Sequence, residues 1–121
     1  MAKITDLLGK TMTNVENIED EELVFTTTDG TRYKLFHDRD CCEFVFIESI
    51  VGELADLVGE PLLLVEESTS DKNPEGVSIA RQEGTYTWTF YKFATRKGYV
   101  DVRWYGESNG YYSESVDFMK I

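Results

Sequence analysis

The side chains with the most versatile chemistry lie within one short stretch of the chain, HDRDCCEFVFIES, residues 37–49. It contains the only histidine, His37, and both cysteines, Cys41 and Cys42. A cysteine beside a histidine can act as a nucleophile, and the same side chains with a carboxylate can bind zinc. Structural zinc sites use spaced pairs such as C-x-x-C, which this chain lacks. Adjacent residues of a strand point to opposite faces, so we expect two reduced thiols and no disulfide.

Acidic residues surround these candidates. Negative charge disfavours the thiolate form of a cysteine, so Asp38, Asp40 and Glu43 argue against a thiol nucleophile. Together with Glu48 they could hold a hard cation, but the D-x-D-x-D-G spacing of a calcium loop is absent. No P-loop, dinucleotide-binding, nucleophile-elbow or zincin motif occurs elsewhere. We therefore predict no catalytic residue, no metal and no cofactor, and interpret the stretch as a charged turn leading into a core strand.

The length and charge of the chain narrow the classes of partner. Its 121 residues suit a single domain, and 12 basic against 23 acidic residues give a net charge of −11. This charge disfavours binding to duplex nucleic acid, which requires clustered cations. Because the sequence contains neither a signal peptide nor an apolar run of membrane-spanning length, we expect a cytoplasmic protein that does not contact a membrane. One acidic cluster stands out: Glu16, Glu19, Asp20, Glu21 and Glu22.

Two short segments have helical patterns. Apolar residues recur at helical spacing between Ser49, a suitable N-cap, and Gly59, a suitable C′ residue, which predicts a helix over residues 50–58. A shorter helix is predicted over residues 4–8, ending before Gly9. Most of the remaining chain has strand patterns. The predicted fold class is α+β, a curved antiparallel sheet with two short helices packed on one side, and a partly closed barrel is the alternative.

The two predicted helices resemble each other. Residues 4–16 align with residues 54–66, and five of the thirteen positions are identical. One interpretation is an ancient duplication that produced two related units, residues 1–50 and 51–121, within the single domain. The other is chance, because helices that run into strands often share an apolar-apolar-Gly pattern.

Several segments are predicted as strands. The sequence on either side of Asp29-Gly30 predicts a hairpin with a two-residue type I′ turn. CEFVFIE, residues 42–48, is apolar on both faces and is typical of a central strand covered on both sides. Near the C-terminus, TYTWTFYKFA, GYVDVRWYG and YYSESVDF predict a three-stranded antiparallel meander. A turn at Arg96-Lys97 predicts its cross-strand pairs: Lys92 with Asp101, Phe90 with Arg103, Trp88 with Tyr105 and Tyr91 with Val102.

One face of this meander is the predicted binding surface. It mixes aromatic rings with cations, a combination that can hold a planar anionic ligand such as a nucleotide. The alternative is that these cross-strand pairs only stabilise the sheet. The predicted ligand-binding residues are Tyr86, Trp88, Phe90, Lys92, Arg103 and Tyr105.

Two runs of the sequence, HDRDCCE and TWTFYKFATRKGYVDVRWYGESNGYYSESVDF, resemble a family of small uncharacterised proteins of bacteriophages and bacteria that is known only as a domain of unknown function. The resemblance implies a phage-encoded cytoplasmic accessory protein and brings no catalytic residues with it. We therefore expect a non-enzymatic protein that binds a small nucleotide-like ligand. In a phage setting, its role would be to sequester that ligand. The alternative is an acidic inhibitor that binds a basic host protein. If the chain is an enzyme instead, His37 with Cys41 or Cys42 is its candidate pair.

Overall fold

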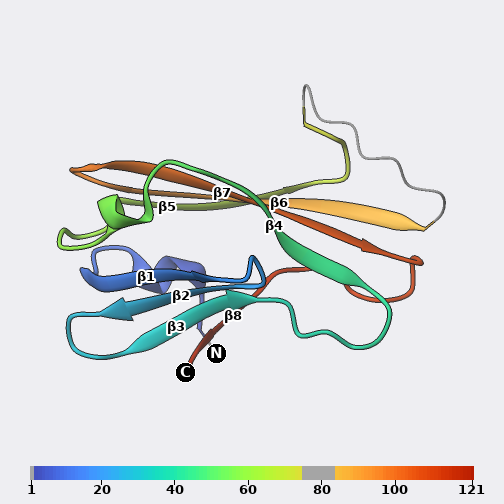
Figure 1. Ribbon diagram of the computed structural model, residues 1–121, viewed down its shortest axis with the longest axis horizontal. Coiled ribbons are helices and arrows are strands. Elements are labelled where there is room, and N and C mark those ends of the chain that lie inside the picture. The colour runs from blue at the N-terminus through green and yellow to red at the C-terminus, as the bar shows by residue number, and fades with distance from the viewer. Residues whose placement is uncertain (1, 75–83) are drawn as a thin grey trace.

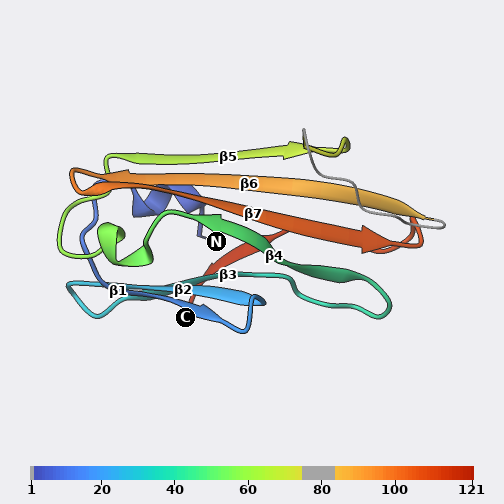
Figure 2. The same ribbon diagram turned by 45° about the horizontal axis from the view of Figure 1, so that its top comes forward.

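The chain forms two antiparallel sheets that pack face to face (Figures 1 and 2). The computed structural model describes residues 2–74 and 84–121. The first sheet has the order β1-β2-β3-β8 and the second the order β4-β7-β6-β5. The strands of the first sheet are β1 (Met12–Ile18), β2 (Glu22–Thr27), β3 (Arg32–Phe36) and β8 (Asp117–Lys120). Those of the second are β4 (Phe44–Val51), β5 (Leu64–Ser70), β6 (Thr85–Thr95) and β7 (Gly98–Ser108).

The core lies between the two sheets. The strands turn alternate side chains inward, except where register shifts interrupt β1 and β4. At the centre, Phe25 of β2 meets Phe93 of β6, with ring centroids 5.3 Å apart. The buried cluster around this pair includes Leu23, Tyr33 and Leu35 of the first sheet and Tyr91, Val100, Val102 and Trp104 of the second.

The predicted α+β class is wrong, because the described residues contain no α-helix. The predicted N-terminal helix is one 3₁₀ turn, η1 (Ile4–Leu7), and the predicted helix over residues 50–58 is the end of β4 followed by a second turn, η2 (Leu54–Leu57). A β-bulge explains the second error. It lies between Ile47 and Ser49 of β4, so that Ile47 and Ile50 both face inward three residues apart. This spacing imitates a helix. The two sheets also remain separate and do not close into a barrel.

Two strand positions differ from the prediction. β4 is an edge strand and not a central one, and because the protein has two layers only its inner face is covered, so Phe44 and Phe46 are 56% and 36% exposed. The predicted third strand of the C-terminal meander leaves the second sheet altogether. Its last part becomes β8, which pairs with β3 in the first sheet. The N-terminal hairpin forms, but its turn has three residues and places Gly30 at a φ of 87°, instead of the predicted two-residue turn.

The β6–β7 hairpin confirms the predicted register. Lys92 pairs with Asp101, and Tyr91 with Val102. The pairs of Phe90 with Arg103 and Trp88 with Tyr105 are also present. This hairpin has eleven residues in each strand, while the equivalent strands β2 and β3 have six and five.

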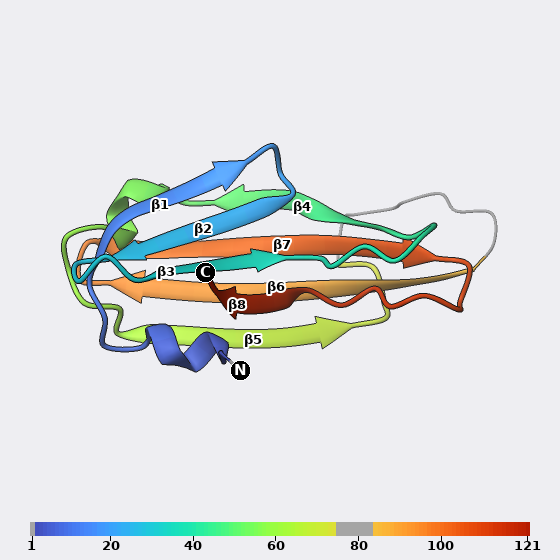
Figure 3. The ribbon, with the colours of Figure 1, turned by 90° about the horizontal axis from the view of Figure 1, so that it is seen from below.

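The two halves of the chain have the same order of elements. Each begins with a 3₁₀ turn, continues as a three-stranded meander, and sends its fourth strand to the edge of the other sheet, since β4 pairs with β7 and β8 with β3. Figure 3 shows η1 beside β5 and η2 beside β1. Reciprocal hydrogen bonds join the halves. The Gly9 amide donates to the Leu62 carbonyl over 2.8 Å, and the Gly59 amide donates to the Met12 carbonyl over 2.9 Å.

We propose that these halves are the duplicated units that the 4–16 and 54–66 alignment suggested. The reciprocal bonds support this proposal, because Gly9 aligns with Gly59 and Met12 with Leu62. The likeness continues into the next strands, where FTTTDG at 25–30 resembles FATRKG at 93–98. Equivalent long-range contacts at aligned positions favour duplication over chance similarity.

The proposal predicts equal roles for Gly9 and Gly59. Both have left-handed backbone conformations, with φ of 83° and 90°, and a Cβ at either position would meet no atom within 4 Å. Alanine at either position should therefore lower the free energy of unfolding by about 1–2 kcal/mol through backbone strain alone. Asparagine, which tolerates this conformation better, should cost less at both. Urea denaturation of the four variants checks this, and a neutral alanine at one of the two positions would contradict the equivalence.

Candidate functional site

The second sheet turns one face away from the core, and all six predicted ligand-binding residues lie on that face. They alternate along β6 and β7 with core residues such as Tyr91 and Phe93, so their side chains leave the sheet on the opposite side. We call this surface the outer face. The structure therefore brings the predicted set together, although its members differ strongly in exposure.

Trp88 and Tyr105 are buried in the outer face instead of being open to a ligand. They are 0% and 1% exposed, and their ring centroids lie 4.8 Å apart. Tyr86 and Phe46 pack against Tyr105 at ring distances of 6.1 and 5.9 Å. The Trp88 indole N–H donates to the Asn73 side-chain oxygen over 3.1 Å. Neither ring therefore has a face that is open to solvent. They form a second, smaller apolar layer.

Arg103 is held by a partner that the sequence analysis did not identify. The bulge in β4 projects Glu48 toward Arg103, whose Nε and Nη2 donate to Glu48 Oε1 over 2.8 and 2.5 Å. The guanidinium carbon also lies 5.3 Å from the centroid of the Trp88 ring. Both charged side chains are about a quarter exposed, at 27% and 24%. Because Glu48 balances its charge, Arg103 has a reduced capacity to bind an anion.

Beside this pair the outer face is hollowed into a depression of about 600 Å³. Phe90 provides a half-buried ring, and Lys92 is exposed and has no ion pair within the described part of the chain. Asp101 Oδ1 is buried there without a hydrogen-bond partner among the described residues. The depression is lined by Ser49, Val51, Glu66, Glu67, Ser68, Phe90, Tyr91, Lys92, Asp101, Val102 and Arg103. It has the size of a small-molecule site and offers a ring, a cation and several acceptors.

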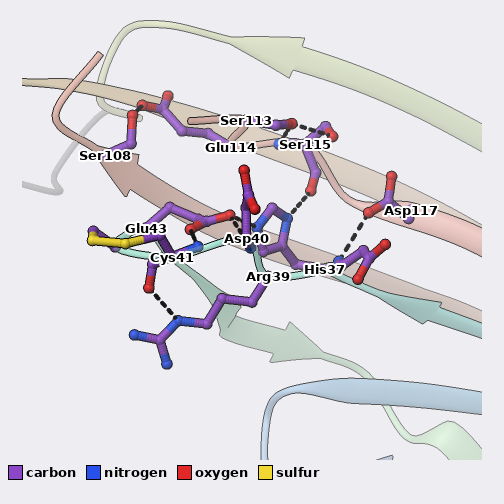
Figure 4. A network of polar contacts seen from close by, with 12 residues as sticks. His37, Arg39, Asp40, Cys41, Glu43, Ser108, Ser113, Glu114, Ser115 and Asp117 are labelled. Atoms are coloured by element: carbon purple, nitrogen blue, oxygen red, sulfur yellow. Dashed lines mark hydrogen bonds and ion pairs between the residues drawn. A yellow bond between two sulfur atoms is a disulfide. The ribbon is translucent and has the colours of Figure 1, made fainter. Parts of the chain in front are cut away.

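The HDRDCCE stretch forms a polar network at the other end of the second sheet (Figure 4). His37 Nδ1 lies 2.7 Å from the Ser115 carbonyl oxygen, and His37 Nε2 lies 2.8 Å from Glu43 Oε2. Both partners are oxygen acceptors, so the His37 ring bridges the Ser115 carbonyl and the Glu43 carboxylate. The network ties the β3–β4 connection to the β7–β8 connection.

Glu43 is the centre of this network, and sequence reasoning did not identify it. Its side chain is fully buried and accepts hydrogen bonds from the backbone amides of Asp40 and Cys41 over 2.8 and 2.9 Å. These amides, with a further contribution from His37, lower the pKa of Glu43 to about 2. Burial of the carboxylate acts in the opposite direction but is outweighed. No pattern in the sequence distinguishes Glu43 from the other acidic residues, because its donors come from a turn. The charged turn of the prediction is therefore organised around a buried carboxylate.

The cysteines also differ from the prediction. Cys41 and Cys42 are joined by a disulfide, since they lie in an irregular turn and not on a strand that would separate their side chains. Neither is a free thiol. Within residues 2–74 and 84–121, no three histidine, cysteine or acidic side chains converge as ligands of a metal ion. In the structure, hydrogen bonds of this region join the β3–β4 connection to the β7–β8 connection.

The acidic cluster lies mainly at the tip of the β1–β2 hairpin. Glu19 and Asp20 both have left-handed backbone conformations, with φ of 55° and 60°. The Asp20 amide donates to the Asn17 side chain over 2.9 Å, and the Ile47 amide donates to the Asp20 carbonyl over 2.7 Å. The tip is therefore fixed against β4 with its carboxylates in solvent.

Comparison with known proteins places the chain in a family. None of the described helices has the length and apolar character needed to cross a membrane. No curated protein and no solved structure is significantly similar to the chain. A family model described as a domain of unknown function, DUF7448, matches residues 5–118, which include both sheets almost entirely. The chain therefore belongs to the DUF7448 family of domains of unknown function.

Proposed function

We propose that the protein is a non-enzymatic binding protein that holds a small planar ligand in the depression of the outer face. The observation that carries this proposal is the position of Phe90, Lys92 and Asp101 around one hollow of about 600 Å³. A ring stacked on Phe90 would have a cation on one side and an unpaired acceptor within reach. These are the features by which shallow sheet surfaces hold nucleobases.

The charges of the depression restrict the ligand. Lys92 is its exposed cation, whereas Glu66 and Asp101 contribute carboxylates and Arg103 is paired with Glu48. A polyphosphate would meet these carboxylates at close range, which is unfavourable. A nucleoside, which is uncharged, or a nucleoside monophosphate, which carries about two negative charges and thus fewer than a polyphosphate, fits better, and its base has N–H donors for Asp101. In the phage setting that the sequence resemblance implies, such binding would sequester a nucleotide-like molecule of the host.

Thermal unfolding with added ligands tests this proposal. Nucleosides and nucleoside monophosphates should raise the unfolding temperature more than triphosphates, with about 2.7 kcal/mol of stabilisation at a hundredfold excess over Kd. Lys92→Gln should weaken monophosphate binding, and Asp101→Asn should weaken binding of the base. Lys120→Gln, the same change on the exposed end of β8, is the matched control. The proposal fails if no ligand stabilises the wild-type protein or if Lys92→Gln behaves like the control.

A second candidate function is inhibition of a basic host protein by the acidic surface. The feature that favours it is the β1–β2 tip, where Glu19 keeps a left-handed backbone conformation that is uncommon for its residue type. Salt distinguishes the two functions. A partner steered by this tip would be released as ionic strength rises, whereas a ring stacked on Phe90 would be retained.

A further inference from the structure

The depression of the outer face is built on two rows of side chains that cross the second sheet. Each row takes one residue from each of β4, β7, β6 and β5, as the cross-strand pairs show. The first row consists of Ser49, Arg103, Phe90 and Ser68, and the second consists of Val51, Asp101, Lys92 and Glu66. All of these residues line the depression, so a ligand bound there would contact both rows.

The first row provides a position for the flat face of a ring. The half-buried ring of Phe90 is the cross-strand neighbour of Arg103 on one side and of Ser68 on the other. The charge of Arg103 is balanced by its ion pair with Glu48. A planar base can therefore stack on Phe90 without meeting a net charge in this row.

The second row alternates in charge. Lys92 is the cross-strand neighbour of both Asp101 and Glu66, and neighbouring strands lie about 4.8 Å apart. Lys92 forms no ion pair within the described part of the chain, and Asp101 Oδ1 is buried there without a hydrogen-bond partner. Asp101 as a whole is only partly buried, so a ligand in the depression can reach its carboxylate. Such a carboxylate is costly to the protein unless a bound molecule donates to it.

We infer, on the basis of the function proposed for this site, that the depression selects guanine among the nucleobases. Guanine has an acceptor, O6, directly beside two donors, N1–H and the N2 amino group. O6 would accept from Lys92, while both donors would pair with the Asp101 carboxylate on the adjacent strand. Adenine and cytosine have an amino group in the place of O6, and this group would point its protons at Lys92. Uracil has a single N–H donor, with a carbonyl in the place of the N2 amino group, and this carbonyl would face the carboxylate.

The two carboxylates beside Lys92 provide a matched pair of variants. Both line the depression, but Glu66 is exposed, whereas Asp101 has the buried oxygen without a partner. Asp101→Asn and Glu66→Gln change the net charge equally, so a difference between them reports the contact with the base and not the general field. Asp101→Asn also exchanges one acceptor for a donor. The new amide would accept from N1–H and donate to a carbonyl at C2, the group that xanthine has in place of the guanine amino group.

The experiment is an NMR titration of the full-length protein with the monophosphates of guanosine, inosine, adenosine, cytidine and xanthosine, in which the amides of Phe90 and Lys92 are followed. Guanosine monophosphate should bind most tightly. Inosine monophosphate, which lacks the N2 amino group, should bind about tenfold more weakly, the value of one charge-assisted hydrogen bond, and the adenosine and cytidine compounds more weakly still. Asp101→Asn should weaken binding of guanosine monophosphate about tenfold and strengthen binding of xanthosine monophosphate. Glu66→Gln should leave the order of the ligands unchanged.

Two results would overturn the selection of guanine. One is binding of adenosine or cytidine monophosphate as tight as that of guanosine monophosphate, and the other is the same change of ligand order in Asp101→Asn and Glu66→Gln. If Asp101→Asn fails to fold, the comparison of guanosine with inosine monophosphate on the wild-type protein decides. Binding without a preference for guanine would refute this inference alone, whereas the absence of binding by every ligand would refute the proposed function as well.

Discussion

Replacing Trp88 by alanine should lower the free energy of unfolding by about 3–5 kcal/mol. The Trp88 side chain lies outside the main core, yet it is completely buried in the outer face between Tyr105, Arg103 and Asn73. Alanine would open a cavity among these groups and leave the Asn73 amide without its indole donor. The loss should equal that of a tryptophan in a conventional core, although Trp88 is on the solvent side of a two-layer protein.

Urea denaturation followed by circular dichroism measures this loss. Phe44→Ala is the control, because Phe44 is an aromatic residue on the same face but is 56% exposed. That variant should cost less than about 1 kcal/mol. A small effect at Trp88, similar to the effect at Phe44, would show that the outer face is not a packed layer and that the ring is available to a ligand.

Glu43→Ala should lower the thermal unfolding temperature by about 10 °C or more. The substitution removes the buried carboxylate that joins the amides of Asp40 and Cys41 to the ring of His37, and all three donors would lose this partner. Differential scanning calorimetry measures the change. Asp40→Asn, an exposed residue of the same turn, is the control and should have little effect.

Acid should have the same effect as the substitution, and its direction follows from the pKa. The pKa of Glu43 falls from 4.5 to about 2 on folding, so the stabilisation that it contributes is complete above pH 4.5 and is lost as the pH falls toward 2. The urea midpoint of the wild-type protein should therefore fall more steeply over this window than that of Glu43→Gln, which cannot titrate. Parallel curves for the two proteins would exclude Glu43 as the titrating group.

Local sequence determined the C-terminal hairpin. Its alternating residues and the short turn before Gly98 are sufficient to pair Trp88 with Tyr105 and Phe90 with Arg103, because hairpin register depends only on turn length and on which face is apolar. The same alternation correctly placed all six candidate binding residues on one face. The similarity between residues 4–16 and 54–66 is likewise a property of the amino-acid sequence alone.

Contacts between distant segments decided the rest. The bulge that turns Ile47 and Ile50 to the same side depends on pairing with β7, so the sequence pattern alone resembled a helix. The burial of Trp88 and the pairing of Arg103 with Glu48 depend on the same neighbouring strand and on Asn73. Glu43 accepts two of its hydrogen bonds from its own turn, and the third, from His37, connects that turn to Ser115, more than seventy positions away along the chain.

The amino-acid sequence by itself thus specified which side chains of a strand share a face and where the hairpin turns lie, since both depend on residues that are close together in the chain. Only the tertiary structure decided which strand lies at an edge and which sheet receives the fourth strand of each half. The physical reason is that the position of a strand in its sheet depends on the total apolar area that the two sheets bury between them. Every strand contributes to that area, so no local segment determines it.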